Sequence, residues 1–381
     1  MRFNRRHQRG LNVIVGLLCL GLRWLPALSA ENPDLPEELR LPSPWVKTID
    51  ARVWSGYADN VLLGNQKSVE SPLLAAGLDL TFYRVPLNGW EFVFVSSGEY
   101  IRYLTAAEVH QEATAIVQGQ VKKSFGQGWQ TGLSADYIYF NQVFDASTFE
   151  DELQAIPVEA HGVTITPFLG RQIGTDTRLE LSLPVTRQFF REFIDDYWEV
   201  GPKLTLTRDL GQGGDLALSY QFLDRIHDTR QIRDADGRIE SGRILSFYEH
   251  ELAASWRKYW DGERHWRTSS RLMLRRNEDN GGGFYDYWRP QFTQQIRYQA
   301  PSWEVRAEGR VAYYHYDRER IAGLDSPHRE KTYLTVSLRG EKSVFKSVKL
   351  FAQYEYERAL SNLHIDTYEA NTYSAGIDCE F

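Results

Sequence analysis

The sequence predicts an all-β protein, a transmembrane antiparallel up-and-down β-barrel of about sixteen strands, with a range of about fourteen to eighteen. Three observations predict this fold: a terminal strand that runs to the last residue, long segments of alternating apolar and polar side chains, and a regular succession of short and long connections. No apolar stretch after residue 30 approaches the ~20 residues that a spanning helix needs, and the mean hydropathy is −0.47. A membrane crossing would therefore use strands.

The N-terminus predicts export. Four arginines lie within the first nine residues, the apolar run Leu11–Leu22 follows, and small residues at Ala27–Ala30 offer a cleavage site. This is the order of a secretory signal peptide, so residues 1–30 are excluded from the fold. Residues 31–45 hold four prolines and predict a short periplasmic lead-in. The barrel is then expected over residues 46–381.

Charge and cysteine content exclude several classes of protein. Removal of residues 1–30 takes five of the 44 basic side chains and no acid, which leaves 39 against 51 and a net charge of −12. Such a chain is not a general nucleic-acid binder. Only Cys379 remains after processing, so neither an intramolecular disulfide nor a thiolate metal cluster is expected. We expect no cofactor.

The last strand, residues 371–381, alternates with a period of two and ends on an aromatic residue. One face holds Tyr373, Ala375, Ile377, Cys379 and Phe381. The strand resembles the C-terminal signal by which bacterial outer-membrane barrels are recognised for insertion, with Ser374, Gly376, Cys379 and Phe381 in its slots. Cys379 stands where a larger apolar residue is usual. The resemblance implies a bacterial outer-membrane location, with the barrel-assembly machinery, membrane lipids and lipopolysaccharide as partners. A soluble sheet that ends by chance in this way is the alternative.

The connections also predict strand number and orientation. Short turns fall at residues 86–89, 126–128, 174–176, 211–215, 261–262 and 300–302 and around 345. Longer connections fall near residues 58–71, 104–108, 141–156, 188–196, 225–242, 277–284, 317–330 and 360–365. Seven short and eight long connections imply sixteen strands with both termini at the short-turn, periplasmic side. Prolines at 167, 184, 202 and 290 predict local irregularity, because proline cannot donate to the ladder.

Alternation places a basic arc on the inner face. The arginines that point inward are Arg267, Arg271, Arg275, Arg289, Arg297, Arg306, Arg310 and Arg339. Charges facing lipid at mid-bilayer would cost ~2–4 kcal/mol each, so charged inner faces indicate a wet lumen. The alternative is that these arginines form ion pairs with the inward glutamates at 304, 308, 355 and 357, and that the paired side chains only fill the lumen.

The connection Asn141–Pro157 carries Asp145, Glu150, Asp151 and Glu152. Its position and charge resemble the third loop of sixteen-stranded general porins, which folds into the lumen opposite a basic wall. The resemblance implies a constriction that filters solutes by size and charge, although the usual Pro-Glu-Phe-Gly-Gly segment is missing. The alternative is an acidic loop solvated outside.

Other motifs are weak. Asp234–Gly237 superficially matches a calcium loop but lacks the third acid, and an Asp-Gly turn fits better. Residues 277–283 could hold a divalent ion, although a solvated loop is the default. Histidines are scattered and no Gly-x-Ser-x-Gly or His-Glu-x-x-His motif occurs, so we expect no enzyme, no catalytic residue and no metal site. A barrel hydrolase is the residual alternative.

The segment Trp54–Val61 resembles the opening of several porin-like barrels, including ones linked to export. Helical repeats, which usually precede the barrel in those systems, are missing here. We therefore expect a porin-like channel for passive diffusion of small polar solutes. The rival is a structural, export or assembly barrel with a packed lumen and partner-binding loops. The oligomeric state stays open, a homo-oligomer included.

Overall fold

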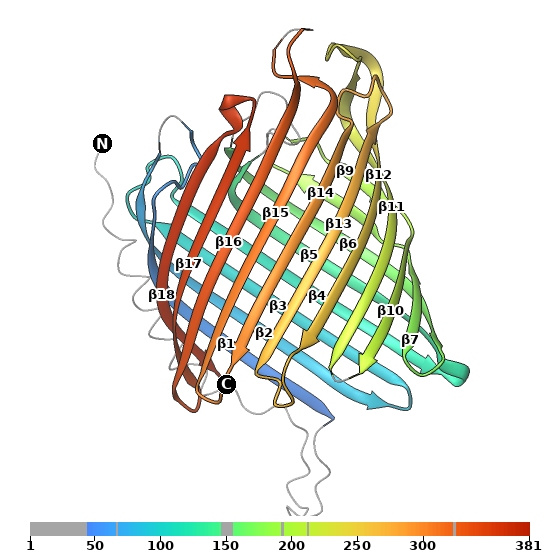
Figure 1. Ribbon diagram of the computed structural model, residues 1–381, viewed down its shortest axis with the longest axis vertical. Coiled ribbons are helices and arrows are strands. Elements are labelled where there is room, and N and C mark those ends of the chain that lie inside the picture. Colours follow the sequence, from blue (N-terminus) through green and yellow to red (C-terminus); the bar gives the residue numbers. More distant parts are fainter. Residues whose placement is uncertain (1–43, 66–67, 146–154, 192–193, 212, 323–324) are drawn as a thin grey trace, which may run out of the picture. The chain divides into compact units, whose positions relative to one another are not determined.

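The protein is described by a computed structural model that covers residues 44–381 apart from 66–67, 146–154, 192–193, 212 and 323–324. The predicted signal peptide lies outside these residues. Eighteen strand segments form one antiparallel sheet (Figure 1). They are β1 (Trp45–Ala58), β2 (Ser71–Leu87), β3 (Trp90–Tyr103), β4 (Gln111–Phe125), β5 (Trp129–Asp145), β6 (Ala155–Ile173), β7 (Thr177–Ser182), β8 (Val185–Phe190), β9 (Tyr197–Val200), β10 (Lys203–Gly211), β11 (Gly214–Arg233), β12 (Ile239–Tyr259), β13 (Trp266–Asp279), β14 (Tyr287–Gln299), β15 (Trp303–Arg320), β16 (His328–Phe345), β17 (Val348–Ser361) and β18 (Tyr368–Glu380).

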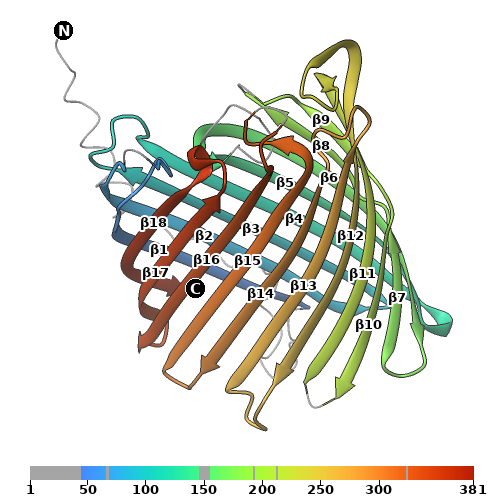
Figure 2. The ribbon, with the colours of Figure 1, turned by 45° about the horizontal axis from the view of Figure 1, so that its top comes forward.

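The sheet closes on itself between its first and last strands. β1 pairs with β2 on one side and with β18 on the other, where Ala51 lies opposite Cys379. The pairing reaches the end of the chain, since the N–H of Phe381 donates to the carbonyl of Ile49 at 2.8 Å. Blue β1 and red β18 accordingly lie side by side in Figures 1 and 2. A closed sheet leaves no open edge, which is what a lipid surround requires.

Sixteen strands span the barrel, as the connections predicted. β7 and β8 are two parts of one strand, because both pair with β6 in the same register. β9 and β10 are likewise two parts of the next strand, and both pair with β11. The breaks fall at Leu183-Pro184 and at Gly201-Pro202.

The prolines explain these breaks. Gly201 donates its N–H to the carbonyl of Pro184 at 3.4 Å, and Phe222 donates its N–H to the carbonyl of Pro202 at 3.1 Å. The prolines thus accept across the sheet but cannot donate, and the ladder is interrupted beside them. The predicted irregularity is confirmed at Pro184 and Pro202. Pro167 instead lies within an unbroken β6. At Pro290 only the pairing of β14 with β15 is interrupted, because Arg289 and Pro290 have no backbone pairing partners on β15.

Two long connections are shorter than the sequence predicted. β5 continues to Asp145, which pairs with Ala155, so the connection expected at Asn141–Pro157 is wrong at both ends. The expected connection 225–242 is also wrong, since β11 runs to Arg233 and β12 starts at Ile239. In β11 the polar run 227–231 interrupts the apolar alternation that predicts a strand, although the strand continues beyond it.

The outward face is apolar and broadly exposed. Leu252, Leu272 and Leu338 are 57%, 60% and 48% exposed and would lie against lipid. Tryptophans at strand ends, such as Trp198 and Trp303, are also about half exposed, as in an aromatic girdle. Among the described residues, no helix is both long and apolar enough to cross a membrane.

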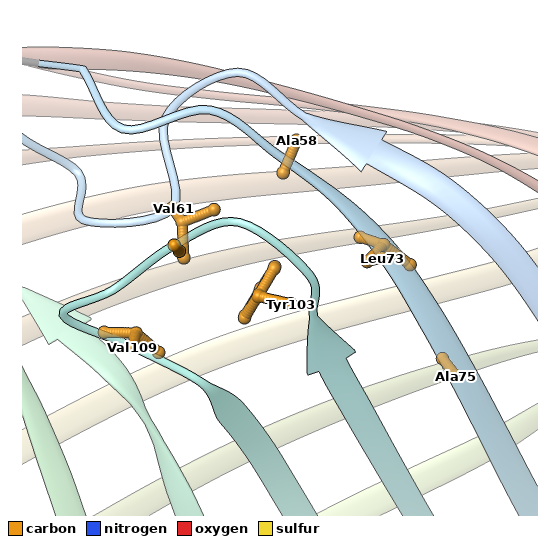
Figure 3. Packing of buried hydrophobic residues seen from close by; sticks show 7 residues of the cluster. Ala58, Val61, Leu73, Ala75, Tyr103 and Val109 are labelled. Carbon is orange, nitrogen blue, oxygen red and sulfur yellow. The ribbon is translucent and has the colours of Figure 1, made fainter. Parts of the chain in front are cut away.

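An apolar cluster lies at the long-loop end of the first strands. Its buried members are Ala58, Val61, Leu73, Ala75, Tyr103, Ala106 and Val109. Figure 3 shows Val61 and Val109, which belong to loops, beside Leu73 and Tyr103 of β2 and β3. These two loops pack apolar side chains against the strands at one side of the mouth, where Ala58, Val61 and Tyr103 also border a cavity.

Candidate functional site: a charged lumen

Two neighbouring cavities line one side of the lumen. The larger, of about 650 Å³, is bounded by β1–β4 and β15–β18. It extends from Lys349 and Glu380, at the short-turn end, to Tyr103 and Glu112. The second cavity, of about 440 Å³, continues from Tyr103 and Glu112 to Asn60 in the first long loop. Both are lined mainly by polar and charged side chains, because the inner positions of these strands alternate with the lipid-facing ones.

Both cavities border on the same six residues. They are Tyr103, Glu112, Glu308, Ser337, Glu355 and Thr372, which we call the junction. The junction draws on β3, β4 and β15–β18, strands from opposite ends of the chain that barrel closure makes neighbours. The two cavities therefore adjoin each other along this wall, and together we call them the passage.

Ion pairs and rings hold the basic side chains of the passage. Arg52 contacts Asp79 at 2.8 Å and Glu99 at 3.7 Å. Arg339 contacts Glu341 at 2.6 Å, and its guanidinium lies 3.9 Å from the ring centroid of Phe351. A guanidinium bonded to a carboxylate and stacked on a ring keeps a fixed orientation. The charged lining is thus ordered.

The opposite wall carries an ion-pair ladder across β9, β11, β12 and β13. Its members are Glu199, Arg225, Glu249, Glu251, Arg271 and Arg275. Glu249 is only 2% exposed and lies between Arg225, at 2.9 Å, and Arg275, at 2.7 Å. Two cations around one buried carboxylate satisfy its charge. This wall is filled by paired side chains, which is the packing that the rival prediction assumed.

The eight predicted arginines divide between these environments. Arg306, Arg310 and Arg339 line the passage. Arg271 and Arg275 belong to the ladder. Arg267 and Arg289 donate to Gln295 and Gln291, and Arg297 pairs with Glu304.

The predicted acidic loop stays a prediction, because most of it lies outside the described residues. Glu150, Asp151 and Glu152 lie outside the described residues, and Asp145 is described only by its backbone in β5.

Sequence reasoning missed most acidic residues of the site. Asp79 and Glu99 line the larger cavity, and Glu249 is the centre of the ladder. The alternation of β2, β3 and β12 places all three inward, so the pattern was available in the sequence. Their partners were not, because cross-strand contacts depend on register.

The Trp54–Val61 segment has a structural role at the closing seam. The carboxylate of Asp59 accepts both the backbone N–H and the side-chain amide of Asn371, at 2.7 and 2.8 Å. Asn60 donates to the carbonyl oxygens of Gly64 and Glu369 and accepts the N–H of Gly64. These bonds fasten the first loop to β18. The segment therefore stabilises closure.

The two loop motifs are also structural. Asp234 accepts the N–H groups of Asp236 and Arg238, and Gly237 has φ +82°, as the predicted Asp-Gly turn requires. Asp279 accepts the N–H groups of Gly281, Gly283 and Tyr285, so its carboxylate orders the loop from within. Within the described residues, no group of three or more His, Cys, Asp or Glu could hold a metal ion.

A closed antiparallel barrel with sixteen spanning strands, an apolar outer face and a charged inner face is the architecture of porins. The chain therefore has the fold of a transmembrane β-barrel.

The chain is similar in fold to several solved outer-membrane proteins. It matches OccAB1 of Acinetobacter baumannii at 8% identity and TM-score 0.46, over 89% of this chain and 97% of that one. It matches the anion-selective porin of Comamonas acidovorans at 12% identity and TM-score 0.44, over 88% and 99%. OprD of Pseudomonas aeruginosa gives 11% identity and TM-score 0.45, over 88% and 94%. No protein-family model and no curated protein matches the chain.

Proposed function

We propose that this protein is a passive channel for small polar solutes. The observation that carries the proposal is the passage, two adjoining cavities that share six lining residues. Polar and charged side chains line it from Lys349 at one end to Asn60 at the other. Charged groups facing water can replace part of the hydration of a polar solute while it moves. Catalysis is not part of this proposal.

The channel would also depend on lining arginines, on the surrounding membrane and on the machinery that inserts it. Arg306, Arg310 and Arg339 would contribute to selectivity, because they line the passage. Membrane lipid and lipopolysaccharide would cover the exposed apolar face. The barrel-assembly machinery would read Ser374, Gly376, Cys379 and Phe381 on the closing strand. The oligomeric state is left open.

A second candidate function is favoured by the ion-pair ladder and by the apolar cluster at the mouth. Both fill part of the lumen with paired or buried side chains. A barrel that is mainly packed could serve structure, export or assembly and bind a partner through its loops.

Planar-bilayer recordings of the purified protein separate the two functions. A channel gives discrete current steps whose size increases with salt concentration. The proposal is overturned if protein that migrates as a folded barrel on unheated gels gives no steps at any salt concentration.

A further inference from the structure

The charged side chains at the junction are all negative. Of the six residues that border both cavities, three are glutamates and none is basic. Glu112 comes from β4, Glu308 from β15 and Glu355 from β17, so carboxylates approach the passage from both sides of the closing seam. Glu308 and Glu355 are exposed to the lumen, and Glu112 is half-buried.

Hydrogen bonds fix the orientation of two of these side chains. Glu112 accepts the hydroxyl of Tyr103 at 3.0 Å and the backbone N–H of Val143 at 2.9 Å. Glu308 accepts the side-chain amide of Gln295 at 2.9 Å. These donors are neutral, so they hold the carboxylates in place and leave the negative charge of the junction uncompensated by them.

The passage as a whole, junction included, carries an excess of negative charge. Nine carboxylates and four basic groups line the larger cavity, and the smaller one adds only one of each, so acids exceed bases by five. Three of the five basic groups are paired with lining carboxylates, Arg52 with Asp79, Arg339 with Glu341 and Lys349 with Glu380. A water-filled passage between low-dielectric walls concentrates the field of such an excess and attracts cations.

We propose that Glu112, Glu308 and Glu355 make the channel prefer cations, so that its substrates are small polar cations. This inference rests on the proposed channel function. The arginines on the wall order the carboxylates, and the sign of selectivity is set by the acids that they leave in excess.

The test is the reversal potential in a tenfold KCl gradient. We expect the wild-type protein to show K⁺ permeating better than Cl⁻. The isosteric double variant Glu308→Gln/Glu355→Gln should lower the ratio of K⁺ to Cl⁻ permeability by about twofold or more, because it removes two lumenal charges without changing side-chain size. Each single variant should have part of this effect.

Glu180→Gln is the matched control. Glu180 faces inward on β7, pairs with Arg178 and borders neither cavity, so its loss should leave the permeability ratio unchanged. Current steps with Cl⁻ preferred, or a ratio that the double variant does not move, would overturn the inference but keep the channel. Folded protein without current steps would overturn the channel and the inference with it.

Discussion

Gly376 shows at the residue scale how tightly the barrel is closed. It lies on β18 opposite Trp54 of β1. A Cβ at this position would collide with the carbonyl oxygen of Val53 and with the Cβ of Trp54. Gly376 belongs to the predicted insertion signal, and close packing against β1 also requires a glycine at this position.

We expect Gly376→Val to destabilise the folded barrel by about 1–3 kcal/mol, the usual cost of overpacking. The measurement is the urea midpoint of the loss of folded mobility on unheated gels. Gly340→Val is the matched control, because no atom lies within 4 Å of a Cβ at that position on β16. Equal destabilisation by both variants would contradict the close approach at the seam.

At the element scale, a buried ion-pair cluster joins three segments at the long-loop end. Arg329 of β16 contacts Glu319 of β15 and Asp366 of the β17–β18 connection, both at 2.6 Å. All three side chains are at most 7% exposed. Asp366→Ala should cost about 3 kcal/mol of unfolding free energy, since it removes one partner of a buried cation. The urea midpoint measures this loss.

Glu369→Ala is the control for that prediction. Glu369 forms an exposed pair with Arg358 at 3.9 Å, and exposed pairs contribute at most about 1 kcal/mol. If the two variants destabilise equally, the cluster does not hold the loops together.

The loop between β13 and β14 should respond to pH. Burial raises the pKa of Asp286 to about 6 from 3.8, and the nearby Asp279 carboxylate adds to the rise. The folded loop therefore holds the Asp286 proton more tightly than the unfolded chain does. Its contribution to stability is complete below about pH 4 and is lost as the pH rises through about 6.

Hydrogen exchange of residues 279–286, corrected for intrinsic rates, should show more protection at pH 4 than at pH 7. In Asp286→Asn the protection should be equal at both, because the amide stays neutral and its oxygen still accepts the N–H of Asp279. The turn at Asp261 is the internal control. Desolvation acts to raise the pKa of Asp261, but hydrogen bonds from the N–H groups of Trp266 and His265 lower it overall. That turn should gain no protection on acidification.

At the scale of the whole molecule, closure can be tested with the native cysteine. Cys379 lies opposite Ala51 across the β1–β18 seam. Ala51→Cys should therefore form an oxidative cross-link with Cys379, because paired cross-strand Cα atoms lie within the span of a disulfide. The product is a circular species with altered mobility on heated gels without reductant.

Val53→Cys provides the comparison, since Val53 lies opposite Ile377, two residues away from Cys379. Its cross-linking yield should be much lower. Similar yields from both variants would mean that β1 and β18 do not pair in this register.

The sequence predicted the strand count, the short turns and a terminal strand that runs to the end of the chain, because turn residues and period-two alternation are local properties. Predictions from the sequence were wrong or missing where the local pattern is interrupted or where contacts between distant residues matter. The sequence predicts a loop at the end of the β11–β12 hairpin, because the polar run 227–231 interrupts the apolar alternation. The role of Glu249 could not be predicted from the sequence, because it depends on ion pairs with Arg225 and Arg275 on neighbouring strands.

By itself, the sequence determined the fold class of this protein. An inner face of alternating charges and an outer face of apolar residues fit only a closed sheet in lipid. The tertiary structure alone decided which charges meet. Glu112 and Glu355 are far apart in the chain, and they border one passage only because barrel closure makes the first and last strands neighbours and register aligns their side chains.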